Sequence, residues 1–278
     1  MVKNKLVWIT GASSGIGKAI ALEYAAHGAA LILSARRQSE LEKVKQDCID
    51  VMRQNDIQDN DILVLPLDVT QHETLETITR QAFEFKGKID VLINNAGVSQ
   101  RSTCIETDMQ TYRTLFEVDV FGQIALTKAV LPLMIEQGAG HIAVTASVSG
   151  KIGVPFRTGY CAVKHAMMGF FDSLRSEVAH QNIKVSTITP GYIRTDVARN
   201  ALKGDGSAAG KTDPEIETGM DVNDCAKAIV KGLNKTKKEI AVGKGIEMYA
   251  LWIKRFFPSV LPKILEKEYQ KRLVKTKA

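Results

Sequence analysis

The chain has 278 residues, of which 45% are hydrophobic and 24% are charged, the composition of an ordinary soluble globular protein. No signal peptide and no run of 18 apolar residues is visible, so we expect neither secretion nor a membrane-spanning helix. The four cysteines are widely spaced and form no C-x-x-C pair. This pattern argues against a zinc site and a disulfide framework, and it favours free thiols in a reducing, cytoplasmic compartment.

The net charge of +6 is unevenly distributed. From Lys231 to Ala278 there are 13 Lys and Arg against 4 Asp and Glu, so this segment alone carries +9. The basic character therefore belongs to the C-terminal segment, and the rest of the chain is slightly acidic.

The first predicted strand, Leu6–Ile9, leads into a glycine-rich turn with the pattern T-G-x-x-x-G-x-G, and a helical pattern follows. Gly11 allows a tight turn, Gly15 lets the backbone approach a pyrophosphate, and Gly17 lets the helix pack on the strand. An anion at this place would meet free N–H groups at the start of the helix. The sequence therefore predicts a dinucleotide site, with a plain tight turn as the alternative.

The second predicted strand, Ala29–Ala35, ends at Arg36 and Arg37. NAD-specific sites have an acidic residue near this position, which binds the ribose 2′-hydroxyl. A guanidinium group suits a 2′-phosphate instead, so we expect NADP(H) rather than NAD(H). The alternative is that one or both arginines are only solvated.

Further apolar strands alternate with amphipathic helices, which predicts a doubly wound parallel β-sheet, a Rossmann fold with three α/β/α layers. The remaining strands are expected at Ile62–Leu67, Ile89–Ile93, His141–Ala146, Lys184–Thr189 and Glu239–Gly243. The helices are expected at Lys18–His27, from Ser39 to about Arg53, from Thr70 to about Lys86, at Tyr112–Gln137 with a bend or break at Pro132, at 157–181, and from Asp221. Three capping boxes are expected: Ser39 with Glu42, Thr70 with Glu73 and Thr107 with Gln110.

Polar and glycine-rich motifs follow several of the predicted strands directly. They include Asp68, Asn94–Gly97, Ser147 and Pro190–Gly191. Ligands of open parallel sheets bind at the carboxyl ends of the strands. We therefore expect these motifs to share one site, where Asp68 could bond an adenine amino group.

Tyr160 and Lys164 are four residues apart on a predicted helix and so share one face. An ammonium group near a phenol stabilises the phenolate, which makes the pair suitable for moving a proton on or off an alcohol oxygen. A Y-x-x-x-K match alone is weak, because a buried tyrosine beside a solvated lysine is the commoner arrangement.

Together these motifs resemble the short-chain dehydrogenase/reductase family over residues 5 to 243. The resemblance rests on Thr10–Gly17, Asn94–Gly97, Ser147 thirteen residues before Tyr160, the Tyr160/Lys164 pair, and P-G followed by Thr195. The stretches ILVLPLDVT and GVSQRSTC are similar to the dehydrogenase/reductase member 7 subfamily, which includes carbonyl, retinoid and steroid reductases.

The resemblance implies a role for each motif residue. Tyr160 would donate a proton to a carbonyl oxygen while NADPH delivers hydride to the carbon, and Ser147 would hydrogen-bond the same oxygen. Lys164 would bond the nicotinamide ribose and stabilise the tyrosine phenolate. The cofactor-binding residues expected are Gly11, Ser13, Ser14, Gly15, Ile16, Gly17, Arg36, Arg37, Asp68, Val69, Asn95, Ala96, Gly97, Tyr160, Lys164, Pro190, Gly191, Ile193 and Thr195.

One position departs from the family pattern. The family has an asparagine in the long helix, where it kinks the helix and its backbone carbonyl holds a water in a proton relay to the lysine. Here Asp119 stands at that place. The carbonyl survives the change, but the amide donor is lost and a charge is added near Lys164. We expect Asp119 to belong to the catalytic group and activity to be modestly reduced.

We expect residues 1–245 to form the NADP(H)-binding catalytic domain and 246–278 a basic, partly apolar extension. Within the domain, the glycine- and alanine-rich segment 203–210 suits a lid over the substrate, with a plain surface loop as the alternative. The extension carries Trp and Phe side chains among Lys and Arg. It could cover the cleft or pack on a partner subunit, or it could contact an anionic membrane surface peripherally.

The sequence thus predicts an NADPH-dependent oxidoreductase that interconverts an apolar or bulky ketone or aldehyde and its alcohol. The alternative is an NADP(H)-binding regulatory protein on the same fold. The resemblance implies a homodimer or homotetramer through the helices at 107–137 and 157–181. Nucleic-acid binding is not expected, because no recognition motif accompanies the basic charge.

Overall fold

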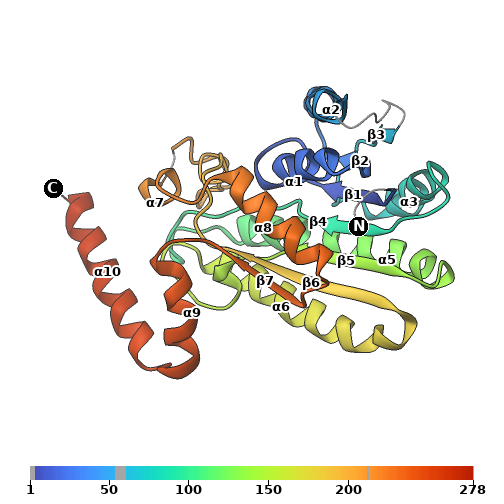
Figure 1. Ribbon diagram of the computed structural model, residues 1–278. Coiled ribbons are helices and arrows are strands. Elements are labelled where there is room, and N and C mark those ends of the chain that lie inside the picture. The colour runs from blue at the N-terminus through green and yellow to red at the C-terminus, as the bar shows by residue number, and fades with distance from the viewer. Residues whose placement is uncertain (1–3, 54–60, 212, 278) are drawn as a thin grey trace.

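The computed structural model describes residues 4–53, 61–211 and 213–277, and a seven-stranded parallel sheet forms its centre (Figure 1). The strand order is β3-β2-β1-β4-β5-β6-β7. All strands are parallel, and the order in which the chain adds them to the sheet reverses between β1 and β4, as in a doubly wound sheet. The strands are β1 Leu6–Thr10, β2 Ala30–Ser34, β3 Ile62–Val64, β4 Val91–Asn94, β5 Gly140–Thr145, β6 Ile183–Pro190 and β7 Glu239–Val242. The predicted three-layer α/β fold is confirmed.

Helices cover both faces of the sheet. The main helices are α1 Gly15–Ala26, α2 Gln38–Met52, α3 Leu75–Glu84, α4 Met109–Phe116, α5 Gly122–Glu136, α6 Thr158–Glu177, α7 Pro214–Glu217, α8 Val222–Asn234, α9 Ile246–Phe256 and α10 Val260–Lys277. Shorter turns of other helix types are η3 His72–Thr74, η4 Glu117–Phe121, η5 Val148–Gly150 and η6 Ala179–Gln181.

Two hydrophobic cores follow from the alternation of side chains along the strands. In β1, Val7 and Ile9 join a core that includes residues of α1, α2 and α8, whereas Leu6 and Trp8 join a core that includes residues of α3, α5 and α6. All four side chains are fully buried. Strands buried on both faces are continuous apolar runs, which is why the strand positions could be predicted from the sequence.

The third strand ends earlier than expected, at Val64. The next residues still run beside β2, because the Leu65 N–H bonds to the Leu33 carbonyl and the Leu67 N–H to the Ala35 carbonyl. Pro66 between them has no N–H to donate, so the regular ladder stops while the chain keeps its direction.

The long helix between β4 and β5 is divided, but not at Pro132, which lies inside the continuous helix α5. The division is the π-helical turn η4, where the Gly122 N–H bonds to the Glu117 carbonyl five residues back. Asp119 lies within this π-helical turn, and its side chain is fully buried. The kink that the family resemblance implies at Asp119 therefore has a structural counterpart in a π-turn.

The three predicted capping boxes are absent. Helix α2 begins at Gln38, so Ser39 already lies inside it, and helices α3 and α4 begin after Thr74 and Asp108 without a side-chain cap. Thr70 instead bonds the Asp68 carboxylate through both its N–H and its hydroxyl. The hydroxyl of Thr107 bonds the Thr103 carbonyl. In both cases the threonine shapes the loop before the helix.

By length and composition the helical run Met109–Glu136 would qualify as membrane-spanning, which the sequence analysis did not expect. Leu115, Leu126, Val130 and Met134 of this run are buried in the core beneath the sheet. Apolar core helices of soluble proteins pass the same test of composition.

After β7 the chain forms a hairpin of two helices, α9 and α10, which projects from one end of the molecule (Figure 1). Its inner side chains, among them Met248, Leu251 and Leu261, pack against Val148 and Ile152 around η5. The extension predicted from residue 246 is therefore helical and joined to the body.

Candidate functional site

A cavity of about 630 Å³ lies at the carboxyl ends of the strands. Every residue that the sequence analysis placed in the catalytic or cofactor-binding groups lines this cavity, except Gly17. Side chains from the glycine turn, from the segments after β2, β3, β4, β5 and β6, and from helix α6 meet here. The structure thus brings these residues together around one cavity.

The glycine turn between β1 and α1 adopts a conformation that requires its glycines. Gly11 and Gly15 have φ of +65° and +54°, in the left-handed region that side chains disfavour. A Cβ on Gly11 would also lie 2.9 Å from the Ala96 Cα. Gly17 packs against the Gly11 backbone, outside the cavity wall, so its role is helix packing.

A partly buried hydrogen-bond network joins the ends of β1, β4 and β5. The hydroxyl of Thr10 accepts hydrogen bonds from the N–H groups of Asn95 and Ala96, both at 3.0 Å. The Asn95 amide donates to the Thr10 carbonyl and accepts from the Thr145 hydroxyl. The Asn95 side chain thus fixes the cavity wall, and the adjacent backbone faces the cavity.

The predicted phosphate and adenine positions lie at the far end of the same cavity. Arg36 and Arg37 are exposed and line it just after β2. Asp68 and Val69 line it after β3, and one Asp68 oxygen accepts the two Thr70 hydrogen bonds described above. Two guanidinium groups at this place provide positive charge where an adenosine 2′-phosphate would require it.

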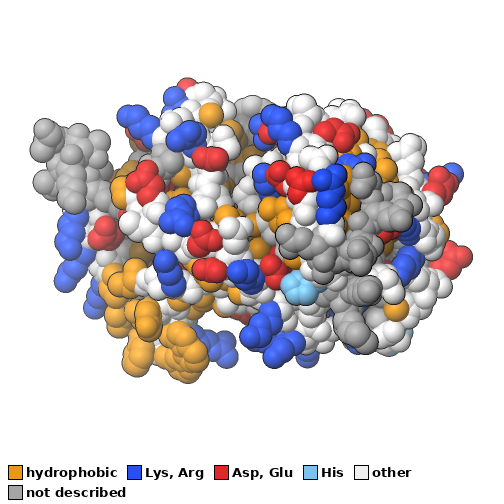
Figure 2. All heavy atoms as spheres, turned by 45° about the horizontal axis from the view of Figure 1, so that its top comes forward, with side chains coloured by type: hydrophobic (Ala, Val, Ile, Leu, Met, Phe, Trp, Pro, Cys, Tyr) orange, Lys and Arg blue, Asp and Glu red, His pale blue; other side chains and the backbone are white. Residues whose placement is uncertain are grey.

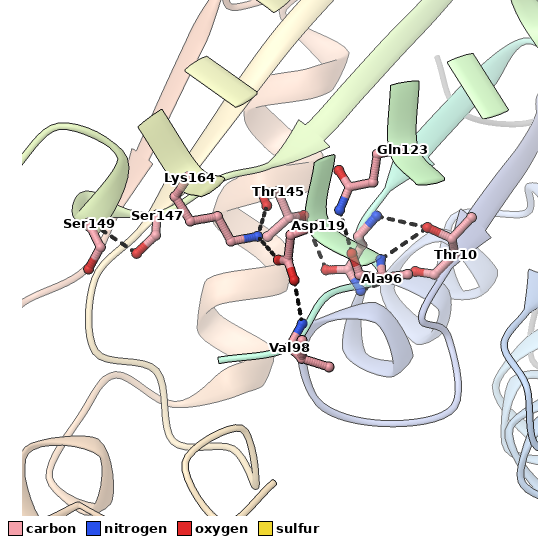
Figure 3. Close-up of polar contacts among 10 residues, drawn as sticks. Thr10, Ala96, Val98, Asp119, Gln123, Thr145, Ser147, Ser149 and Lys164 are labelled. Atoms are coloured by element: carbon pink, nitrogen blue, oxygen red, sulfur yellow. Dashed lines mark hydrogen bonds and ion pairs between the residues drawn. The ribbon is translucent and has the colours of Figure 1, made fainter. Parts of the chain in front are cut away.

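Lys164 is buried and its ammonium group is held on two sides (Figure 3). Nζ donates to the Thr145 carbonyl at 3.0 Å and lies 2.8 Å from Asp119 Oδ1. The other Asp119 oxygen accepts the Val98 N–H at 2.9 Å. Asp119 thus connects Lys164 to the segment after β4. A neutral asparagine at this position could not form the ion pair.

The protonation of this pair follows from burial and charge together. Burial raises the pKa of the Asp119 carboxyl above its usual value, although Lys164 and the Val98 N–H favour the anion. Burial alone would lower the pKa of Lys164, but Asp119 and the Tyr160 oxygen outweigh it and hold this pKa above its usual value. The raised pKa of Asp119 favours a neutral carboxyl group, whereas the raised pKa of Lys164 depends on an ionised one. We favour the ionised pair, because both carboxylate oxygens lie within hydrogen-bonding distance of N–H groups.

Tyr160 lies near the start of α6, where Gln100 fixes the backbone. The side-chain carbonyl of Gln100 accepts the Gly159 N–H at 2.8 Å and the Tyr160 N–H at 3.3 Å, so it caps a helix that has no cap of its own. The Lys164 Nζ lies 5.6 Å from the centre of the Tyr160 ring. Gln100 is itself fully buried, which makes the position of the tyrosine a property of the fold.

Ser147 lines the same cavity at the start of η5. Its hydroxyl oxygen accepts the Ser149 N–H at 3.1 Å, which leaves the hydroxyl hydrogen available for a cavity ligand. Ser147, Tyr160 and Lys164 all line the cavity together. The arrangement provides two O–H donors and one cation, which is what a carbonyl oxygen gaining negative charge requires.

The residues present fit a nicotinamide dinucleotide. The glycine turn leaves space at the N-terminus of the twelve-residue helix α1, whose free N–H groups suit a pyrophosphate. Arg36 and Arg37 would hold a 2′-phosphate at one end, and Lys164 has a third N–H with which to hold a ribose at the other.

The remaining wall of the cavity comes from three segments, at residues 99–104, 151–157 and 191–220. Their cavity-lining residues include Ser99, Arg157, Tyr192, Leu202, Ala208 and Ile216. Asp213, at the start of α7, joins these segments. One of its oxygens pairs with Arg101 and the other with Arg157 Nη2 at 2.9 Å.

Several residues that position the site carried no signal in the sequence. Gln100 accepts two backbone N–H groups at the start of α6. Gln123 on α5 donates to the Ala96 carbonyl (Figure 3). Thr114 and Val118 line the cavity from the long helix. Val118 is the residue before Asp119 and Thr114 lies five residues before it, so their position near Asp119 in the long helix was the signal that could have indicated them.

Comparison with known proteins agrees with the motifs. The family model described as short chain dehydrogenase matches residues 5–206. A "Dehydrogenase/reductase SDR family protein 7-like" from Anopheles gambiae is 38% identical over 270 residues, which cover 97% of this chain and 84% of that protein. "Dehydrogenase/reductase SDR family member 7" from Homo sapiens is 37% identical and covers 97% of this chain and 79% of its own.

Among solved structures, a short-chain dehydrogenase from Streptomyces avermitilis matches with a TM-score of 0.77 and 30% identity. The match covers 98% of this chain and 99% of that one, so it includes the α9–α10 extension almost completely. The resemblance drawn from the motifs, to the family and to its member 7 subfamily, is confirmed.

Proposed function

This chain belongs to the short-chain dehydrogenase/reductase family of oxidoreductases, and on that premise we propose that it is an NADPH-dependent enzyme interconverting a carbonyl compound and its alcohol. The substrate would be an apolar or bulky ketone or aldehyde. The observation that carries the proposal is the cavity in which Ser147, Tyr160 and Lys164 meet, with Arg36 and Arg37 at its far end.

When bound, NADPH supplies the hydride that reduces the carbonyl carbon. The Tyr160 hydroxyl donates its proton to the carbonyl oxygen, and the Ser147 hydroxyl donates a hydrogen bond to the same oxygen. Lys164, held by Asp119 and the Thr145 carbonyl, keeps a positive charge beside the tyrosine and stabilises the phenolate that remains. In the oxidation direction the same groups act in reverse.

The test is NADPH consumption with a panel of ketones and aldehydes, comparing the wild type with Tyr160→Phe. This variant keeps the ring and removes only the proton donor. We expect NADPH to bind both proteins, as measured by thermal shift, and turnover to fall by at least about a hundredfold in the variant. Equal turnover in both proteins on every substrate would overturn the catalytic role of Tyr160.

A regulatory protein that binds NADP(H) without turnover is the second candidate, and the Asp119–Lys164 ion pair favours it. The pair compensates the positive charge that the lysine would otherwise direct at the tyrosine. Under this alternative, wild type and Tyr160→Phe would bind NADPH alike and neither would consume it with any substrate.

We also propose a cytoplasmic location and a homodimer or homotetramer. The location is supported by the four free cysteines, of which only Cys104 is exposed. The oligomer is suggested by the family resemblance through residues 107–137 and 157–181, and light scattering of the purified protein would test it.

A further inference from the structure

The hairpin of α9 and α10 exposes an unusual number of large apolar side chains. Seven of the eleven exposed large hydrophobic residues in the described part of the chain lie on it, so they form a patch and are not scattered singly. We call them the hairpin stripe. They are Ile246, Tyr249, Trp252, Phe256, Phe257, Val260 and Ile264.

The stripe follows from helical spacing. Tyr249, Trp252 and Phe256 stand at positions i, i+3 and i+7 of α9 and therefore share one face. The rings of Trp252 and Phe256 stack, with centroids 5.6 Å apart and planes at 13°. Phe257 continues the stripe through the turn, and Val260 and Ile264 continue it along α10.

The opposite face of the hairpin is occupied, which fixes the direction in which the stripe points. Leu261 is buried against Val148 and Ile152 of the body. The ring of Tyr269 lies 5.2 Å from that of Phe156, and the Glu247 carboxylate accepts the Tyr192 N–H at 3.1 Å. The inner face therefore already serves to cover the body beside the cavity, and the stripe remains turned outward.

Basic side chains border the stripe. Lys254 and Arg255 precede Phe256, Lys263 precedes Ile264, and all three are exposed. From residue 246 to 278 the chain has 8 Lys and Arg against 3 Asp and Glu. Figure 2 shows apolar side chains gathered at this end of the molecule, with Lys and Arg side chains close by.

We propose that the hairpin stripe docks on the surface of an anionic lipid bilayer, with its aromatic rings at the level of the headgroups. Tryptophan and tyrosine favour this interface, and basic residues beside them gain energy from anionic lipids. A second copy of the chain fits less well. A two-fold interface pairs a patch with itself, which would bring the two sets of basic residues together, whereas the cores of protein interfaces are depleted of charge.

The chain contains its own reporter for this contact. It has two tryptophans, of which Trp8 is fully buried in the core and Trp252 is 66% exposed. We expect the full-length protein to float with vesicles of phosphatidylcholine containing phosphatidylserine, and to bind pure phosphatidylcholine at least about tenfold more weakly. Tryptophan emission should shift to the blue on binding, and quenching by acrylamide should fall, because only Trp252 changes its surroundings.

Two pairs of matched variants separate the apolar from the electrostatic part. Trp252→Ser with Phe256→Ser should reduce vesicle binding about tenfold or more, whereas Ile105→Ser with Met109→Ser, also exposed but outside the hairpin stripe, should not. Lys254→Glu with Arg255→Glu should have a comparable effect on anionic vesicles, whereas Lys227→Glu with Lys231→Glu on α8 should not. Circular dichroism of each variant checks that it is folded.

These readouts need no turnover, so the proposal can fail while the enzymatic function stands, and the reverse. The proposal would be overturned if the wild-type protein did not float with anionic vesicles at any vesicle concentration. It would also be overturned if the two control variants lost as much vesicle binding as the two hairpin variants. If the emission shift instead appears with rising protein concentration and no lipid, and light scattering shows a dimer that Trp252→Ser with Phe256→Ser abolishes, the stripe is an interface between copies.

Discussion

Asp119 stands where the family resemblance implies an asparagine, and the structure shows the contacts that the carboxylate makes. Its carboxylate is fully buried, pairs with Lys164 and accepts the Val98 N–H. An asparagine could accept the same N–H, but it would leave the lysine charge uncompensated. The side chain therefore sets how much positive charge the lysine presents to Tyr160.

Asp119→Asn should move the alkaline limb of the pH–rate profile for carbonyl reduction to lower pH. Removing the anion lowers the pKa of Lys164, which Asp119 now holds above its usual value, and leaves the lysine free to stabilise the phenolate. Reduction needs the protonated tyrosine, so activity should be lost earlier as pH rises. For alcohol oxidation, which needs the phenolate, the rising limb should shift in the same direction. Superimposable profiles of variant and wild type would show that the carboxylate has no such effect.

Arg36 and Arg37 decide the cofactor in our proposal. Replacing both with Ala should raise the KM for NADPH about ten- to a hundredfold and leave that for NADH nearly unchanged, because a charge-assisted hydrogen bond contributes about 1.5–3 kcal/mol. Steady-state kinetics with both cofactors measure this. Arg80→Ala, an exposed arginine on α3, serves as control. A parallel loss with both cofactors would mean that the arginines do not recognise the 2′-phosphate.

At the scale of elements, the segment after β6 is held to the segment after β4 along its length. The Leu202 N–H bonds to the Ser99 carbonyl and the Arg101 N–H to the Leu202 carbonyl, both at 2.8 Å. Gly204 accepts bonds from Asp108 and Thr111. The glycine- and alanine-rich stretch is thus an ordered wall in this structure, and its movement as a lid stays a prediction.

Asp213→Asn should loosen this wall. The change leaves two guanidinium groups without their shared anion, and we expect a cost of roughly 1–3 kcal/mol because the three side chains are largely buried. Limited proteolysis should cut within 191–220 faster, and the KM for the carbonyl substrate should rise more than that for NADPH. Asp205→Asn in the same segment, whose carboxylate bonds only locally to Ser207, is the matched control. Unchanged proteolysis would show that the ion pairs do not hold the segment.

The sequence predicted elements well where one physical cause dominates. Buried parallel strands are apolar runs, and the positive φ angles of the first turn require glycine. Both features were therefore located from the sequence within a few residues. It failed where the outcome depends on tertiary partners. Ser39 and Thr70 have the residue types of caps, but neighbours in the fold determine where α2 and α3 begin. The π-turn at Glu117–Phe121 was not predicted, because its hydrogen bond from Gly122 to Glu117 leaves no signature in residue type.

In the site, the residues with chemical reactivity were predictable and those that position them were not. Tyr160 and Lys164 could be identified from their residue types and their four-residue spacing. Gln100, which caps the helix that carries them, is an ordinary polar residue sixty positions away in the sequence. Only the crossing of the segment after β4 over the start of α6 brings it there.

At the scale of the whole molecule, one buried histidine should couple folding to pH. His141 on β5 is buried beside the Ser186 hydroxyl at 2.8 Å, and burial, with Lys5 and Lys184 nearby, lowers its pKa to about 4. Between the ordinary value of 6.5 and 4, the unfolded chain binds this proton and the folded chain does not. Stability therefore falls as pH falls through this window, by about 3 kcal/mol in total.

His141→Gln should remove that part of the pH dependence. Urea unfolding of wild type and variant at a series of pH values from 7 to 4 measures the difference in the free energy of unfolding, which should narrow as the pH falls. His180→Gln, an exposed histidine, should leave the wild-type slope as it is. If the free energies of unfolding of wild type and His141→Gln differ by a constant amount across the series, His141 does not carry the effect.

The hairpin touches the cavity from outside, since Glu247 holds Tyr192 and Tyr269 meets Phe156 next to Arg157. If the hairpin stripe binds lipid as proposed, the mouth of the site would open near the bilayer. An apolar substrate would then reach it by lateral diffusion within the leaflet. The reaction would then follow two-dimensional kinetics. Adding empty vesicles at constant substrate would dilute the substrate across more surface and slow the enzyme, although nothing in the aqueous phase had changed.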